Sequence, residues 1–306
     1  DLHRVDRRQR QMCIRDRCTC VLKYLTEINL LYCRAFYFHV ECPAFLYSRI
    51  MKKTLWFVFS RKNILMYKKA DGSYEIPEGT NPCESYAKAD FVTLRFQGIE
   101  AKAYLAELGE SDIPNYEFVP LRRTFFFLSE EIYAMACKME ELVYWNNETR
   151  FCGRCGSRME FSSSISKKCC ECGHEIWPSL QIAIIVLVKR DDKVLLVQSK
   201  NFKSDYMGLV AGFVETGETL EQAVNREVME ETGLKIKNLR YIKSQVWPFP
   251  CNLMAGYVAD YESGDIQIQE SELSKGGWYS RDKMPPLPDE ASIARQIINA
   301  WIDQKI

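Results

Sequence analysis

Short apolar runs alternate with turn residues over residues 51–125. The runs are rich in β-branched and aromatic side chains, and pairs such as Asp71-Gly72 and Asn81-Pro82 separate them, a pattern typical of strands joined by tight turns. The expected strands cover residues 55–59, 64–67, 91–96, 101–105 and 116–119. The pattern predicts an N-terminal β-rich domain over residues 51–128.

The spacing of apolar residues changes after residue 128. Ile132, Met135 and Met139 recur at helical spacing, and Ser129 suits the N-cap position. These features predict a helix over residues 129–146. We expect it to form a link, over residues 129–149, between the first domain and the rest of the chain.

Residues 179–306 combine both patterns and are expected to form a domain of mixed α and β structure. Apolar runs at 182–189 and 194–198 flank Asp191-Asp192, which predicts a hairpin. The remaining expected elements are a charged helix over 219–232, strands at 241–246, 253–261 and 277–279, and a last helix over about 289–304. The fold class expected for the whole chain is α+β.

Composition agrees with a folded protein of more than one domain. The chain has 306 residues, of which 47% are hydrophobic and 27% are charged, which suits two domains and a small module. Its longest apolar run, around residues 182–188, is too short to cross a bilayer. Lys+Arg and Asp+Glu both total 41, so the chain has no global basic field for nucleic acid.

The first 50 residues differ from the rest in charge and pattern. They hold nine Lys or Arg and five Asp or Glu, which leaves 32 basic and 36 acidic residues in 51–306. They show no periodicity and no signal-peptide pattern, and residues 12–17 resemble translated sequencing-adapter read-through. We expect Met51 to be the natural start and residues 1–50 to be an extraneous extension. The alternative is a basic arm or a targeting segment.

Five of the 13 cysteines lie within one short stretch. Two C-x2-C pairs there can each direct two thiolates at one point, and four thiolates make a closed tetrahedral Zn²⁺ site without an open position. We therefore predict one structural zinc in a ribbon over residues 150–178, and a reducing, cytoplasmic setting. Four unrelated buried thiols are the alternative. The expected ligands are Cys152, Cys155, Cys169 and Cys172.

The charged helix expected over 219–232 concentrates carboxylates on one side. Glu227, Glu230 and Glu231 stand at positions i, i+3 and i+4, so they share a helix face. Oxygen ligands at this density suit Mg²⁺ or Mn²⁺, and a tight loop before the helix brings Glu215 and Glu218 near the same ions. The alternative is a solvated acidic helix with Arg–Glu pairs.

This stretch resembles the Nudix box, G-x5-E-x7-R-E-U-x-E-E-x-G-U with U aliphatic. Residues 212–234 read GFVETGETLEQAVNREVMEETGL, which fits every fixed position. The resemblance implies a Nudix hydrolase with an α/β/α sandwich fold, which cleaves a nucleoside diphosphate linked to another group. It also implies divalent cations bound to the glutamates of the box.

A second motif resembles the NADH pyrophosphatase branch of that family. The branch carries S-Q-P-W-P-F-P-x-S after the box, and residues 244–252 read SQVWPFPCN. Val246 and Asn252 depart from the motif, which puts a strict preference for NADH in doubt. Trp247 and Phe249 offer flat surfaces for stacking a base or nicotinamide. A zinc ribbon between a β-rich domain and the box domain supports the same branch.

The resemblance also implies roles for individual residues. Arg226 is expected to orient the box carboxylates, and Glu231 or a neighbouring carboxylate to accept the proton of water. The expected catalytic residues are Glu218, Arg226, Glu227, Glu230 and Glu231. The implied Mg²⁺ or Mn²⁺ ligands are the Ala211 carbonyl, Glu227, Glu231 and Glu272. The implied substrate contacts are Arg122, Trp177, Phe213, Gln245, Val246, Trp247, Pro248, Phe249, Pro250, Cys251, Asn252 and Ala294.

The expected reaction is the hydrolysis of NADH or NAD⁺ to NMN(H) and AMP by a cytoplasmic homodimer. Removal of an NAD cap from RNA by the same chemistry is one alternative, and a broader hydrolase of nucleoside diphosphates linked to other groups is another. A zinc-ribbon adaptor that binds nucleotides without catalysis is a third. The intact box argues against the adaptor, because binding alone does not need three crowded carboxylates.

Overall fold

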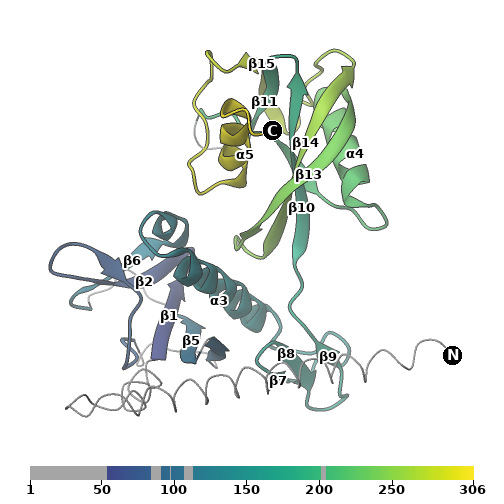
Figure 1. The fold of residues 1–306 in the computed structure, drawn as a ribbon. Coiled ribbons are helices and arrows are strands. Elements are labelled where there is room, and N and C mark those ends of the chain that lie inside the picture. The colour runs from purple at the N-terminus through teal and green to yellow at the C-terminus, as the bar shows by residue number, and fades with distance from the viewer. Residues whose placement is uncertain (1–53, 84–90, 97, 107–112, 201–204) are drawn as a thin grey trace, which may run out of the picture. The chain divides into compact units, whose positions relative to one another are not determined.

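The computed structural model describes residues 54–83, 91–96, 98–106, 113–200 and 205–306. The expectation for residues 1–50 lies outside the described residues. The chain divides after Met51. The unit from Lys52 to Ile306 is considered by itself below (Figure 1). Among the described residues, no helix combines the length and apolar character needed to cross a bilayer.

The first sheet has six strands in the order β3-β2-β1-β5-β4, with β6 also paired to β2. The central strand β1 is antiparallel to β2 and parallel to β5. The predicted strands of this region are confirmed, and one two-residue strand is added. The strands are β1 (Thr54–Ser60), β2 (Asn63–Lys68), β3 (Tyr74–Glu75), β4 (Val92–Phe96), β5 (Ile99–Leu105) and β6 (Tyr116–Pro120).

Both faces of β1 are buried, and successive side chains of the strand point to opposite faces. Phe57 and Phe59 pack in a core with Met139 of α3 (Glu130–Glu148), while Trp56 and Val58 belong to a second core on the other face. Helix α3 follows a 3-10 turn, η2 (Leu121–Phe126). A helix is therefore confirmed where the sequence predicted one, over residues 129–146, and it covers one face of the first sheet.

A small three-stranded sheet follows, in the order β7-β8-β9. Its strands are β7 (Met159–Ser163), β8 (Ser166–Cys169) and β9 (Glu175–Ile176). Lys167 in β8 is only 2% exposed. Its Nζ donates to the carbonyls of Asn146 at 2.8 Å and of Thr149 at 3.1 Å, at the end of α3. The negative end of the helix dipole stabilises a cation at this position. Lys167 therefore connects the small sheet to α3.

The second large sheet has the order β13-β14-β10-β11-β15, with β12 also paired to β10. Strand β10 is antiparallel to β11 and parallel to β14. The predicted hairpin is confirmed at Asp191, whose φ of 54° forms the tight turn. The strands are β10 (Gln181–Arg190), β11 (Lys193–Ser199), β12 (Val210–Phe213), β13 (Lys235–Trp247), β14 (Asn252–Ser263) and β15 (Leu273–Ser280).

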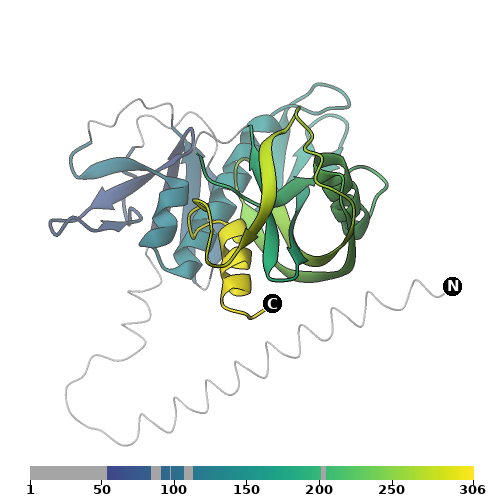
Figure 2. The ribbon, with the colours of Figure 1, turned by 90° about the horizontal axis from the view of Figure 1, so that it is seen from above.

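Helices cover both faces of this sheet (Figure 1, Figure 2). Val224 and Val228 of α4 (Leu220–Thr232) pack with the even-numbered apolar residues of β10. Ile297 and Trp301 of α5 (Ile293–Ile302) pack with the odd-numbered ones. The run of apolar residues in β10 is therefore buried on both sides, and the expected α/β/α sandwich is confirmed.

The last helix is shorter than the sequence predicted. It begins at Ile293 rather than near residue 289, because Ser292 is its N-cap and accepts a hydrogen bond from the Ala294 N–H at 3.2 Å. Residues 289–291 therefore belong to the connection before α5, where the Ala291 carbonyl accepts a hydrogen bond from the Gln245 side chain.

Candidate active site

Helix α4 has well-defined ends, which fix the direction of its carboxylates. At its start, the Thr219 hydroxyl accepts from the Gln222 N–H at 3.2 Å, and the Gln222 side chain accepts from the Thr219 N–H at 2.7 Å. This reciprocal pair is a capping box. At its end Gly233 adopts a left-handed conformation, with φ of 71°, which glycine tolerates without strain.

Two carboxylates of α4 point into the protein. Glu227 is 9% exposed and Glu231 is 4% exposed, while Glu230 lies at the surface. Burial raises the pKa of Glu231 to about 8, and the nearby charges of Glu227, Glu272 and Glu230 add to this rise. Burial also raises the pKa of Glu227. Glu272, from the segment before β15, therefore joins the α4 carboxylates.

The cluster fits a divalent cation. Within the described part of the chain, the buried Oε2 of Glu231 has no hydrogen-bond partner, a costly state for a carboxylate. A bound Mg²⁺ or Mn²⁺ would both pair with this oxygen and offset the mutual repulsion of Glu227, Glu231 and Glu272. The residues present therefore suit the ions that the sequence motif implies.

Gly212 lets the β12 backbone approach the same carboxylates. A Cβ atom at this position would overlap the Glu227 carboxylate, so no larger residue fits without displacing it. Gly212 pairs with Ile184 of β10, and the adjacent Ala211 pairs with Ile185. The contact of Glu227 with Gly212 thus places the cluster beside the strand that bears Ala211, whose carbonyl is a predicted metal ligand.

Arg226 forms hydrogen bonds to several residues of the box. It donates to Glu218 Oε1 at 2.6 Å, to Glu227 Oε1 at 2.8 Å, to Glu230 Oε2 at 3.1 Å and to the Phe213 carbonyl at 2.9 Å. These bonds raise the pKa of Arg226 and lower that of Glu218. The guanidinium therefore links the loop before α4 to the helix, as expected for an orienting residue.

An open hollow of about 490 Å³ adjoins this loop. Phe213 is 54% exposed, so its ring is available to a ligand. Trp177, the other aromatic residue predicted to border the substrate, is 56% exposed and follows β9. The hollow is lined by Leu180, Gln181, Ile182, Phe213, Val214, Glu215 and Thr216.

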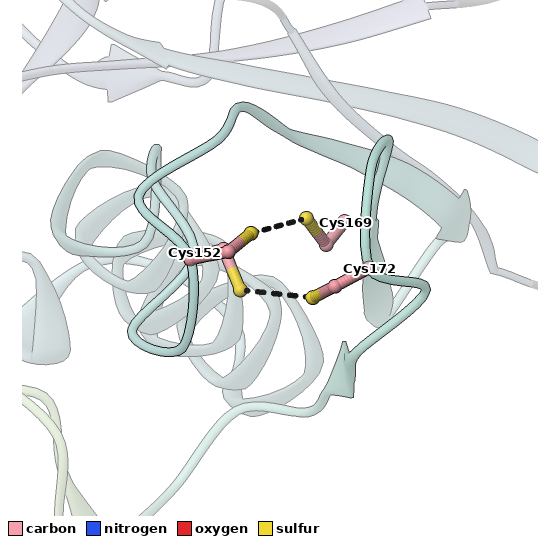
Figure 3. A group of neighbouring side chains, drawn as sticks. Cys152, Cys169 and Cys172 are labelled. Carbon is pink, nitrogen blue, oxygen red and sulfur yellow. Dashed lines mark hydrogen bonds between the residues drawn. The ribbon is translucent and has the colours of Figure 1, made fainter.

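The four predicted zinc ligands converge in the small sheet. Their sulfur atoms all lie within 4.8 Å of one another. The Sγ–Sγ distances are 3.6 Å for Cys152–Cys172 and 3.4 Å for Cys155–Cys169, close to the separation of about 3.8 Å that Zn–S bonds of about 2.3 Å give in a tetrahedron. Figure 3 shows the side chains of Cys152, Cys169 and Cys172 directed toward one another.

Hydrogen bonds from neighbouring residues favour the thiolate form of two of these four thiols, whereas the pKa of Cys172 is raised beside the other cysteines. The Ser157 N–H and then its hydroxyl lower the pKa of Cys155 to about 6, and the Arg154 N–H lowers the pKa of Cys152. Thiolates are the form that binds zinc, so the group fits Zn²⁺. Cys170 is exposed and does not belong to this group.

Comparison with known proteins identifies the family. Residues 179–301 match the family model described as NUDIX domain, and residues 53–145 match the NADH pyrophosphatase-like rudimentary NUDIX domain. The NAD-capped RNA hydrolase NudC of Pseudomonas aeruginosa (strain LESB58) is 41% identical over 204 residues, which cover 66% of this chain and 73% of the relative.

The chain belongs to the Nudix hydrolases. A further relative, the NAD-capped RNA hydrolase NudC of Chromobacterium violaceum, is 37% identical over 227 residues, which cover 73% of this chain and 86% of the relative. Among solved structures, a NUDIX hydrolase from Nitrosomonas europaea aligns with a TM-score of 0.45 and 17% identity, and covers 51% of this chain and 92% of that one. The expected membership of the NADH pyrophosphatase branch is confirmed.

The second motif of this Nudix hydrolase lies at the end of β13. Trp247 and Phe249 meet edge to face, with ring centroids 5.3 Å apart. Arg122 lies over the Trp247 ring, 4.8 Å from its centroid, and donates to Asp289 Oδ1 at 2.8 Å. Gln245 bonds to the backbone of Ala291 and Ile293. Predicted substrate residues from two distant segments, around residues 122 and 247, therefore lie near one another and near the connection before α5.

The other residues of the motif differ in exposure. Val246 is 45% exposed, whereas Asn252 is 8% exposed and its Oδ1 has no hydrogen-bond partner among the described residues. Phe249 packs against the apolar core of the first sheet. Pro248 is buried, Pro250 is exposed and Cys251 is half-buried. Among the predicted substrate residues of the motif, Val246 and Pro250 are therefore exposed, whereas Trp247 is half-buried.

Sequence reasoning missed Asp289 and the backbone of Ala291. Both belong to the connection before α5, which the sequence assigned to the helix itself. The available signal was Ser292, because serine is a favoured N-cap residue and places the helix start at residue 293. The roles of the individual site residues and the domain limits stay predictions.

Proposed function

We propose that this Nudix hydrolase cleaves the diphosphate of NADH or NAD⁺ and yields NMN(H) and AMP. The observation that carries the proposal is the carboxylate cluster around the buried Glu231, next to a hollow that Phe213 borders. Such a cluster suits cations that accompany phosphate chemistry, and an exposed aromatic ring suits a base or nicotinamide. The relatives named NAD-capped RNA hydrolase favour the same class of substrate.

The chain's own residues would divide the work as follows. Glu227, Glu231, Glu272 and the Ala211 carbonyl would hold Mg²⁺ or Mn²⁺, and Arg226 would keep Glu218, Glu227 and Glu230 in place. The bound cations would neutralise charge on the diphosphate and lower the pKa of the attacking water. Glu231 or a neighbouring carboxylate, kept ionised by the cations, would accept the proton of that water.

Zinc would have a separate, structural role. The four thiolates would leave no open coordination position on the ion. The zinc would therefore stabilise the turns that carry these cysteines, next to β7 and β8, and would not take part in the reaction. We propose one Zn²⁺ per chain.

A direct assay tests the main proposal. NADH, NAD⁺, ADP-ribose and a diadenosine polyphosphate would each be incubated with the full chain and Mg²⁺ or Mn²⁺, and the products separated by chromatography. We expect NMNH and AMP from NADH, and activity that chelation by EDTA abolishes and added Mg²⁺ or Mn²⁺ restores. Absence of turnover on every dinucleotide with both cations would refute the proposal.

Removal of an NAD cap from RNA is the second candidate. It is favoured by relatives whose names give this activity, at 41% and 37% identity, and the bond cleaved is the same. The ratio of kcat/KM for an NAD-capped oligoribonucleotide to that for NADH decides between the two. A ratio well above one would make the capped RNA the better substrate.

We also propose a cytoplasmic homodimer. The cysteines of the described residues are all unpaired, which suits a reducing compartment. Two exposed apolar side chains beside the hollow, Leu180 and Ile182, offer a surface that a second copy would cover. Sedimentation velocity at micromolar concentration would show a single species of twice the chain mass of 35.7 kDa. A monomer at that concentration would contradict the dimer.

A further inference from the structure

Gln245 lies near the end of β13, and both ends of its side-chain amide bond to the backbone that leads into α5. Its Nε2 donates to the Ala291 carbonyl at 2.9 Å, and its Oε1 accepts from the Ile293 N–H at 2.7 Å. The side chain is half-buried. The amide's acceptor and one of its donor hydrogens are therefore directed to the protein.

These bonds act where α5 has groups that the helix itself cannot satisfy. The first N–H groups of a helix lack intrahelical partners. Ser292 caps the Ala294 N–H, and Gln245 takes the Ile293 N–H. The first turn of α5, in which Ala294 is 6% exposed and packs in the core, is thus attached to β13.

A second attachment holds the same segment further back. Arg122 donates to Asp289 at 2.8 Å while its guanidinium covers Trp247. The connection before α5 is therefore held at Asp289 and again at Ala291 and Ile293. Both attachments involve the end of β13 near Trp247. Arg122 contacts the Trp247 ring, and Gln245 is two residues before Trp247.

We propose that Gln245 is a positioning residue for dinucleotide binding. It sets the place of the α5 first turn, with Ala294, relative to the Trp247 ring, and it acts through the Ala291 and Ile293 backbone rather than by touching the substrate. This inference rests on the proposed function, because Trp247 and Ala294 are the expected contacts. It gives the glutamine of the second motif a role different from direct recognition.

The test replaces Gln245 by methionine, which keeps the length and removes both hydrogen bonds. We expect Q245M to raise KM for NADH on the order of 10-fold, from the loss of two hydrogen bonds, with kcat changed less than about 3-fold, because the carboxylate cluster is untouched. Hydrogen exchange measured without substrate should become faster in residues 289–296. Lys243→Met is the matched control, because Lys243 joins the same strand to the same helix through Gln296 at 2.6 Å; its KM should stay at the wild-type value.

Each outcome has a distinct meaning. A raised KM with unchanged exchange in the free enzyme would show direct substrate contact and overturn the inference. Faster exchange with an unchanged KM would show a purely structural role and overturn it as well. Failure of the wild-type chain to hydrolyse any dinucleotide would refute the proposed function itself. If Q245M does not fold, Q245E, which keeps the acceptor and loses the donor, carries the same measurements.

Discussion

The first sheet and the Nudix sheet share the order of four strands, β2-β1-β5-β4 in one and β11-β10-β14-β13 in the other. In each, a central strand, β1 or β10, is antiparallel to the next strand and parallel to a later one, β5 or β14. That later strand is antiparallel to the strand before it, β4 or β13. A helix follows the last strand in both cases, α3 or α5. The match of residues 53–145 to a rudimentary NUDIX domain agrees with this correspondence.

The two sheets differ in the connection that precedes β4 or β13. In the Nudix sheet this connection contains α4, with Arg226, Glu227 and Glu231. In the first sheet it consists of residues 76–91, whose sequence contains no Arg-Glu pair and no Glu-Glu pair. We therefore propose that the shared sheet acts as a scaffold and that the box residues of the α4 connection carry the main part of the chemistry. The predictions below test this division, from the largest expected effect to the smallest.

The largest effect is expected from Glu231→Gln. The change keeps the shape of the side chain and removes one charge from the cluster that would hold the cations. We expect kcat for NADH to fall on the order of 10²–10⁴, the range for loss of a positioned acid–base group, while KM moves far less. Steady-state kinetics at saturating Mg²⁺ measure both.

Glu221→Gln is the matched control for this prediction, because Glu221 lies in the first turn of the same helix and is exposed. Its kcat should stay within about 2-fold, since charges at the exposed surface contribute little. Full kcat in the Glu231 variant would show that the α4 connection does not carry the reaction.

The elements that could be predicted from the sequence are those in which a chemical requirement sets the spacing of the residues. The box glutamates must share a helix face, and the cysteines must come in close pairs, so both patterns are visible along the chain. The period of two in β1 and the apolar run of β10 follow equally from burial. The attachment of Gln245 to Ala291 could not be predicted, because it joins a side chain to a backbone atom 46 residues away. Two-residue strands such as β3 were missed because they carry no period.

The second prediction concerns the ribbon, which joins the two domains in sequence. Cys152→Ser removes one thiolate, and because metal binding is coupled to folding, we expect a loss of roughly 4 kcal/mol or more in stability, as is typical of mutations that remove a metal site. Cys170→Ser is the control, since Cys170 is not one of the converging thiols. Elemental analysis and thermal unfolding measure the effect. Purified wild-type protein without zinc would exclude the site.

The third prediction separates substrate choice from rate. Trp247→Ala should remove roughly 1–3 kcal/mol of stacking free energy, so KM for NADH should rise while kcat stays nearly unchanged. A smaller diphosphate without a second ring system should be affected less. Phe151→Ala is the control, because Phe151 is 67% exposed on the ribbon. If binding of every diphosphate were weakened equally, Trp247 would be a packing residue that contacts Arg122 and does not select the substrate.

The smallest effect is expected in α3, the helix that packs on the first sheet and carries no predicted chemistry. Burial and the charge of Glu141 raise the pKa of Glu140 to about 8, and burial raises that of Glu141 to about 7, from a usual value of 4.5. One oxygen of each is buried without a hydrogen-bond partner among the described residues. Both carboxyls therefore favour the protonated form in the folded state.

The sign of the pH effect follows from this. The folded state binds the Glu140 proton more tightly than the unfolded state does, so its stabilising contribution is complete below pH 4.5 and is lost as the pH rises through about 8. Glu140→Gln cannot ionise, so it should be more stable than wild type by roughly 1–2 kcal/mol at pH 9, after allowance for partial exposure, and nearly equal to it below pH 4.5. Denaturant unfolding at both pH values, with the exposed Glu130→Gln as control, measures the difference. An equal effect at both pH values would show that Glu140 acts through packing and not through its charge.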